Sequence, residues 1–78
     1  MIKVPDGAKV AGKSIKDIVG SRHFPSECTF VAVYDQKTEL FSIPRGMQMI
    51  NEGNELFLIS AAEDIKKAVD FLTAQKRH

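Results

Sequence analysis

The chain has 78 residues, of which 44% are hydrophobic and 27% charged, a composition typical of one ordinary globular domain and not of a disordered chain. Its formal net charge of +1 gives no electrostatic reason to expect a nucleic acid as a partner. One cysteine excludes an internal disulfide, and there is neither an apolar run of about 20 residues nor a signal-peptide pattern. We therefore expect residues 1–78 to form a single cytoplasmic domain that does not insert into a membrane.

The N-terminal part of the chain predicts a short strand and then a short helix. Residues 2–4 alternate apolar and polar side chains before a proline, which suits an edge strand. Ser14 forms a short capping-box signal with Asp17, and the apolar residues around them recur at helical spacing. We expect a helix of about two turns that ends near Gly20, followed by a loop over residues 21–27.

Residues 29–34 predict the central strand of a sheet. The segment is apolar on both faces, as in a strand that is covered above and below. Strict alternation puts Phe30 and Ala32 on one face of the strand. It puts Val31 and Val33 on the other face.

Two further strands complete the predicted sheet. Residues 38–43 follow a polar break and end at Pro44, so they read as the return strand of a hairpin. Residues 55–59 are again apolar on both faces and short enough for a strand. Residues 44–53 predict a connection with a brief extended piece. Three apolar residues in it are candidates either for an exposed contact surface or for a cap on one end of the core: Met47, Met49 and Ile50.

The C-terminal part predicts an amphipathic helix. Ser60 with Glu63 makes a capping box, which places the start of the helix at Ser60. Residues 76–78 are basic and would complement the helix dipole near its C-terminus. The apolar residues at the spacing of one helix face are Ile65, Ala68, Val69 and Leu72. The predicted fold class is therefore α+β, with a small, mostly antiparallel sheet of about four strands, a short helix after the first strand and a C-terminal helix.

The sequence offers no convergent set of catalytic or metal-binding groups. The two histidines, His23 and His78, have no cysteine or second histidine at the spacing of a zinc site. Cys28 opens a strand, so we expect a core thiol rather than a reactive one. No serine lies in a nucleophile turn, and the carboxylates are dispersed along the chain. We therefore expect a binding domain and not an enzyme, with no catalytic residues and no metal site.

Three segments in this order resemble a known family, the TrkA-C or RCK_C domain, which is the C-terminal regulatory domain of potassium-transport regulators. The first, residues 10–18, resembles the family's Gly-Lys-Ser segment that enters a short helix. The second, residues 30–44, resembles its valine-rich strand, turn, strand and proline. The third, residues 50–58, resembles its glycine-containing turn before the last strand. With the elements between and around these segments, the resemblance extends over nearly the whole chain.

The resemblance implies an α+β domain that dimerises and holds a small regulatory ligand at the dimer interface. In some members the ligand is cyclic di-AMP, held by the loop and strand that correspond to residues 22–30 here. The candidate ligand-binding residues are Arg22, His23, Cys28, Thr29 and Phe30. The alternative for Arg22 is an ordinary solvated loop charge.

Two functional hypotheses follow from the resemblance. The first is a ligand-sensing regulatory domain of a potassium or other cation transport system, which binds a small ligand at a homodimer interface. The second is a dimerisation or assembly module of a transporter that needs no ligand. The expected partners are a second copy and either a transporter or channel subunit or the rest of a longer chain. As part of a transporter, the domain would act at the inner face of the membrane.

Overall fold

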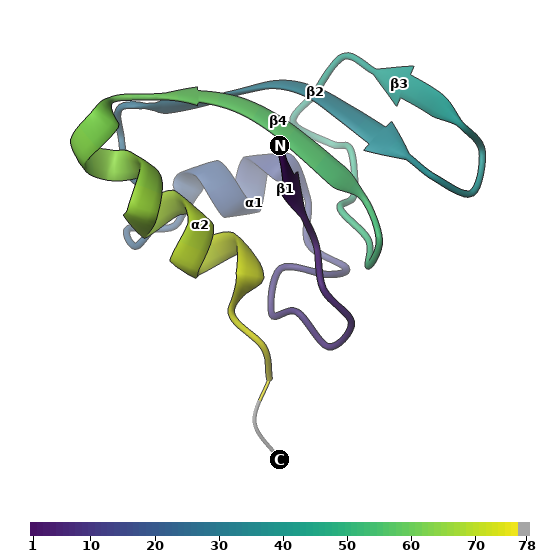
Figure 1. Ribbon diagram of the computed structural model, residues 1–78, viewed down its shortest axis with the longest axis horizontal. Coiled ribbons are helices and arrows are strands. Elements are labelled where there is room, and N and C mark those ends of the chain that lie inside the picture. The colour runs from purple at the N-terminus through teal and green to yellow at the C-terminus, as the bar shows by residue number, and fades with distance from the viewer. Residues whose placement is uncertain (77–78) are drawn as a thin grey trace.

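The computed structural model describes residues 1–76 and shows one antiparallel sheet with both helices packed on the same side (Figure 1). The elements in chain order are β1 (Ile2–Lys3), α1 (Ile15–Gly20), β2 (Cys28–Asp35), β3 (Leu40–Ser42), β4 (Glu55–Ser60), the 3-10 turn η1 (Ala62–Asp64) and α2 (Ile65–Thr73). The four strands lie in the order β1-β4-β2-β3, and every neighbouring pair is antiparallel. The expected α+β fold, with its short helix after the first strand and its C-terminal helix, is confirmed.

Strand β2 lies between β4 and β3, so its expected central position is confirmed. β3 returns antiparallel to β2 as the expected hairpin but spans three residues only. The strand starts only after a turn in which Glu39 has a positive φ of 58°, outside the β region. The chain then reaches β4, which pairs with both β2 and β1.

The strict alternation predicted for the side chains of β2 is wrong, because the strand contains a β-bulge. Phe30 pairs with Leu58 and Ala32 pairs with Phe57, so Val31 is an extra residue with no partner on β4. The extra residue shifts the alternation by one position. As a result Phe30 and Val33 share the buried face, whereas Val31 is 49% exposed.

Only one face of the sheet is covered, which overturns the expectation that β2 is covered above and below. α1 and α2 both lie under β2 and β4 on one side (Figure 1). That side holds the core, which is built from thirteen residues: Val4, Ala8, Val10, Ile15, Ile18, Phe24, Cys28, Phe30, Val33, Ile50, Leu56, Ala68 and Leu72. The opposite side, which we call the open face, carries Val31, Tyr34, Phe41, Phe57 and Ile59. Within residues 1–76 no other element is left to cover it.

The predicted N-terminal helix is confirmed. The Oγ of Ser14 accepts a hydrogen bond from the backbone N–H of Asp17 at 3.2 Å, which caps α1. The carbonyl of Gln48 accepts from the N–H of Ile15 at 2.9 Å, and the carbonyl of Lys13 accepts from the N–H of Ile50 at 2.9 Å. The connection between β3 and β4 therefore contains the expected extended piece, which lies along the start of α1.

The predicted start of the C-terminal helix at Ser60 is wrong. Ser60 is the last residue of β4, and its hydroxyl donates to the carbonyl of Ala61 at 2.9 Å instead of capping a helix. The chain first makes η1, and α2 begins five residues later with no side-chain cap. The helix ends at Thr73, so Lys76 lies beyond it, and residues 77–78 lie outside the described part of the chain.

Candidate functional site

The loop that joins α1 to β2 is anchored to the core by one aromatic side chain. Phe24 is buried and stacks on Phe30 of β2, with ring centroids 5.5 Å apart and an interplanar angle of 16°. It also meets the edge of Phe71 of α2 at 5.9 Å. This anchor holds the two preceding residues, Arg22 and His23, at the surface between the two helices.

Two adjoining depressions flank this loop and share Ser21 and His23 in their walls. The first, of about 340 Å³, lies toward the C-terminal end of α2 and has Phe71 in its wall. The second, of about 460 Å³, lies between the end of α1 and the start of α2 and has Arg22 in its wall. We call the two together the basic groove, because their basic lining residues are Lys9, Lys13, Arg22, His23 and Lys67.

The cationic side chains of the basic groove have no carboxylate partner among the described residues. Within residues 1–76 the only ion pair joins Lys66 to Asp70, at 2.9 Å on the exposed side of α2. Asp64 lies in the wall of the groove as its single carboxylate. The groove is therefore net positive, and its charges remain available to an anionic ligand.

The structure brings together only part of the set of residues expected to bind ligand. Arg22 and His23 are exposed side by side in the groove. Cys28 and Phe30 are buried in the core beneath the loop, where they support it and are not accessible to a ligand. Thr29 pairs with Ile59 on the open face, so the strand separates its hydroxyl from Arg22.

The thiol of Cys28 is poorly suited to nucleophilic chemistry. Burial raises its pKa above the ordinary value of 9.0, the hydrogen bond with Ser60 opposes this shift, and the negative charge of Asp64 adds to it. The group therefore stays a neutral thiol at physiological pH.

Local sequence patterns did not reveal three basic residues of the groove, Lys9, Lys13 and Lys67. Lys9 reaches the groove because its backbone N–H donates to the carbonyl of Ala74 at 2.8 Å, which ties the first loop to the end of α2. Such a contact joins residues far apart in the sequence. The only local signal was that each lysine lies in or beside a predicted loop or on the polar side of a helix.

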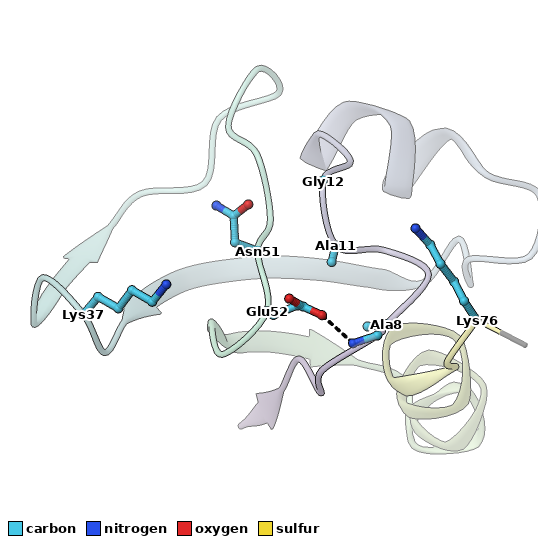
Figure 2. A pocket seen from close by; sticks show the side chains of 8 residues that line it. Ala8, Ala11, Gly12, Lys37, Asn51, Glu52 and Lys76 are labelled. Carbon is cyan, nitrogen blue, oxygen red and sulfur yellow. Dashed lines mark hydrogen bonds between the residues drawn. The ribbon is translucent and has the colours of Figure 1, made fainter. Parts of the chain in front are cut away.

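A third depression, of about 440 Å³, lies between the first loop and the connection before β4. Figure 2 shows Lys37 and Lys76 on opposite sides of it, with Glu52 between them. The carboxylate of Glu52 accepts a hydrogen bond from the backbone N–H of Gly7 and so serves to join the two segments. This depression lacks an aromatic wall, which makes the basic groove the stronger candidate for ligand binding.

Residues 1–76 contain no group of three or more histidine, cysteine, aspartate or glutamate side chains placed to hold a metal ion. No helix among them has the length and apolar character needed to cross a membrane.

Comparison with known families matches the chain to the TrkA-C domain over residues 1–73. Comparison with curated protein sequences gives no significant match. The family match covers almost all of the chain, including every strand and both helices described above. The chain therefore belongs to the TrkA-C family, whose domains have regulatory and not catalytic roles in potassium-transport systems.

Proposed function

We propose that this chain is a ligand-sensing regulatory domain of a potassium or other cation transport system. In this proposal the basic groove binds a small phosphorylated ligand at a homodimer interface, and cyclic di-AMP is the first candidate. The regulated partner is a membrane transporter or channel subunit, or the remainder of a longer chain, at the cytoplasmic face of the membrane.

The observation that carries this proposal is the combination of unpaired cations and an aromatic wall in the basic groove. The guanidinium of Arg22 can donate two parallel hydrogen bonds to a phosphate, and Lys67 in the same depression adds charge. Phe71, which is partly exposed in the wall of the adjoining depression, offers apolar surface for a base. A nucleotide has both a phosphate and a base, so the groove suits a nucleotide better than it suits inorganic phosphate.

A dinucleotide with two phosphates and two bases matches a pair of copies related by two-fold symmetry. Each copy would supply one Arg22 and one His23 to the shared ligand. Binding regulates only if the ligand has different affinities for two arrangements of the copies. The proposal therefore predicts that ligand binding changes how attached transporter parts are placed.

The test is a thermal melt of the purified chain with cyclic di-AMP, ATP, ADP or NADH. A ligand at about 100 times its dissociation constant adds about 2.7 kcal/mol to the free energy of unfolding, which raises the melting temperature of a domain this small by about 10 °C or more. We expect this shift with cyclic di-AMP. Arg22→Ala should weaken the binding by about 10- to 100-fold, because it removes charge-assisted hydrogen bonds.

Two matched pairs of variants control this test. Arg45→Ala removes an exposed arginine outside the groove and should leave binding unchanged. Lys67→Ala should weaken binding, whereas the adjacent Lys66→Ala, which breaks only an exposed ion pair, should not. A shift that survives Arg22→Ala and Lys67→Ala would place the ligand elsewhere on the chain.

The open face favours a second candidate, a dimerisation or assembly module that needs no ligand. Its signature is a stable dimer whose melting temperature does not respond to any of the four nucleotides. That result would overturn the ligand-sensing proposal.

A further inference from the structure

His23 lies in the walls of both depressions that form the basic groove, and of the described residues that do so it is the only ionisable one. Its side chain is exposed, because Phe24, the next residue along the loop, takes the buried position. The backbone N–H of His23 donates to the hydroxyl oxygen of Ser21 at 3.3 Å, so the loop turns at this point. The imidazole therefore stands where the two depressions meet, in reach of a ligand that occupies either of them.

Charged side chains face this imidazole from every neighbouring element of the groove. They are basic with one exception: Lys9 and Lys13 of the first loop, Arg22 of its own loop, Lys67 of α2 and the carboxylate Asp64 of η1. Within residues 1–76 the single ion pair lies elsewhere, on the exposed side of α2, so His23 is not paired with a carboxylate there. A positive charge gained by His23 would therefore add to the net positive charge of the groove.

Histidine differs from the other charged residue types of the groove in the pH range where it titrates. Lysine and arginine ordinarily keep their positive charge, and aspartate its negative charge, throughout the range around neutral pH. A histidine side chain ordinarily gains its proton between about pH 8 and about pH 5. The neutral ring offers one N–H donor and one acceptor nitrogen, whereas the protonated ring offers two donors and a full charge. The protonated ring is the better partner for a phosphate oxygen, which only accepts.

We propose that His23 couples ligand binding in the basic groove to pH, so that the groove binds an anionic nucleotide more tightly when this imidazole is protonated. The inference rests on the ligand-sensing function proposed above and adds acidity as a second input to the same site. A protonated imidazole donates a charge-assisted hydrogen bond to a phosphate, which is about twice as strong as a neutral one. Each copy supplies one His23, so a ligand shared by two copies responds to two protons.

The coupling between proton and ligand acts in both directions. If protonation of His23 strengthens phosphate binding, then phosphate binding must favour protonation by the same factor, and the ligand takes up protons as it binds. The dissociation constant therefore falls as the pH falls through the range in which the imidazole gains its proton. Above that range it levels off at the value that Arg22 and the lysines provide without the imidazolium. A domain of this kind responds to acidification at a constant ligand concentration.

The test is calorimetric titration of the full chain with cyclic di-AMP, whose phosphodiesters keep their charge, between about pH 8 and about pH 5.5. The dissociation constant of the wild-type chain should be about 10- to 100-fold lower at the acidic end, because a charge-assisted hydrogen bond is gained. Titrations near neutral pH in buffers with different heats of ionisation should show proton uptake on binding. His23→Gln keeps a donor but cannot gain a proton, so its affinity should not change with pH and its binding should take up no proton.

Two control variants keep this test decisive, with circular dichroism confirming the fold at each pH. His78→Gln removes the other histidine of the chain and should keep the full pH dependence. Arg22→Ala should weaken binding at every pH and still keep the pH dependence, because the imidazole remains. An affinity that is constant across the pH range, or a pH dependence that survives His23→Gln, overturns the coupling and leaves the ligand-sensing proposal standing. Absence of binding at every pH overturns both.

Discussion

The two faces of the same sheet behave differently although both are apolar. On the helix side Leu56 of β4 is fully buried at 0% exposure, whereas Ile59, three residues later on the open face, is 68% exposed. Residues on the helix side determine whether the domain folds, because their burial stabilises the monomer. Residues on the open face contribute little to the monomer and are available for association. An apolar residue in a strand is therefore not always buried by other residues of its own chain.

Alanine substitutions on the two faces of β4 should differ strongly in their cost to stability. Leu56→Ala should lower the free energy of unfolding by about 2–5 kcal/mol, because it leaves a cavity in the core. Ile59→Ala should lower it by less than about 0.5 kcal/mol when measured below the concentration at which the chain associates. Urea unfolding of both variants in dilute solution measures the difference. Equal losses would mean that the open face is covered within the monomer.

The turn before β4 determines which residues of the strand face the core. Asn54 is buried, and its side-chain Oδ1 accepts from the backbone N–H of Asn51 at 2.9 Å. Its own carbonyl accepts from the N–H of Val4 at 2.9 Å. Asn54→Ala leaves a partly buried N–H without its acceptor, so we expect a loss of about 1–3 kcal/mol by thermal unfolding.

Asn54→Asp is the matched control for that variant, because a carboxylate can keep the accepting oxygen. It should retain more stability than Asn54→Ala at neutral pH. If both variants unfold at the wild-type temperature, the hydrogen bond is not what holds β4 in register.

The N-terminal cap of helix α1 should contribute less to the free energy of unfolding than the core contacts do. Ser14→Ala removes the acceptor for the N–H of Asp17 and should cost about 1 kcal/mol. Ser26→Ala, in the exposed loop before β2, serves as the control and should change the melting temperature very little. A loss as large as that of Leu56→Ala would mean that α1 unfolds entirely without the cap.

The smallest expected effect is the contribution of the buried Cys28 thiol to the pH dependence of the free energy of unfolding. Burial raises its pKa in the folded state, so the folded chain holds the proton more tightly than the unfolded chain. The contribution to stability is fully present below the unfolded pKa and is lost as pH rises toward and through the folded pKa. Urea unfolding of the wild type and Cys28→Ala between neutral and strongly alkaline pH should show the two stabilities converging. A constant difference across that range would mean that the thiol titrates alike in both states.

Much of the fold could be predicted from local patterns. The edge strand ended by a proline, the capped short helix, the hairpin return and the strand after Gly53 all occur where the sequence indicated them. Each of these elements depends on residues that are close together in the sequence, so a local pattern is enough to predict it. The predicted start of the last helix was wrong because it used neighbouring residues alone. The residues from Ser60 to Glu63 match a capping box, but Ser60 pairs with Cys28, and this pairing extends β4 through Ser60.

The candidate site was only partly predictable. Arg22 and His23 stand in a loop whose position beside a strand could be inferred, and the structure brings them together in one groove. Phe30 was expected at the ligand, but it lies in the core and stacks on Phe24. The bulge that follows it brings Val33 to the same side. A bulge leaves no mark in the hydrophobic pattern when both possible registers place apolar residues inside.

Periodicity, turn residues and short motifs were enough to predict the order of the elements, the central position of β2 and membership of the TrkA-C family. They were not enough to predict that helices cover one side of the sheet only, or that Lys9, Lys13 and Lys67 line the same groove as Arg22. Both features depend on contacts between residues distant in the sequence. The backbone bond from Lys9 to Ala74 and the packing of two helices on one face are such contacts, and no local pattern encodes them.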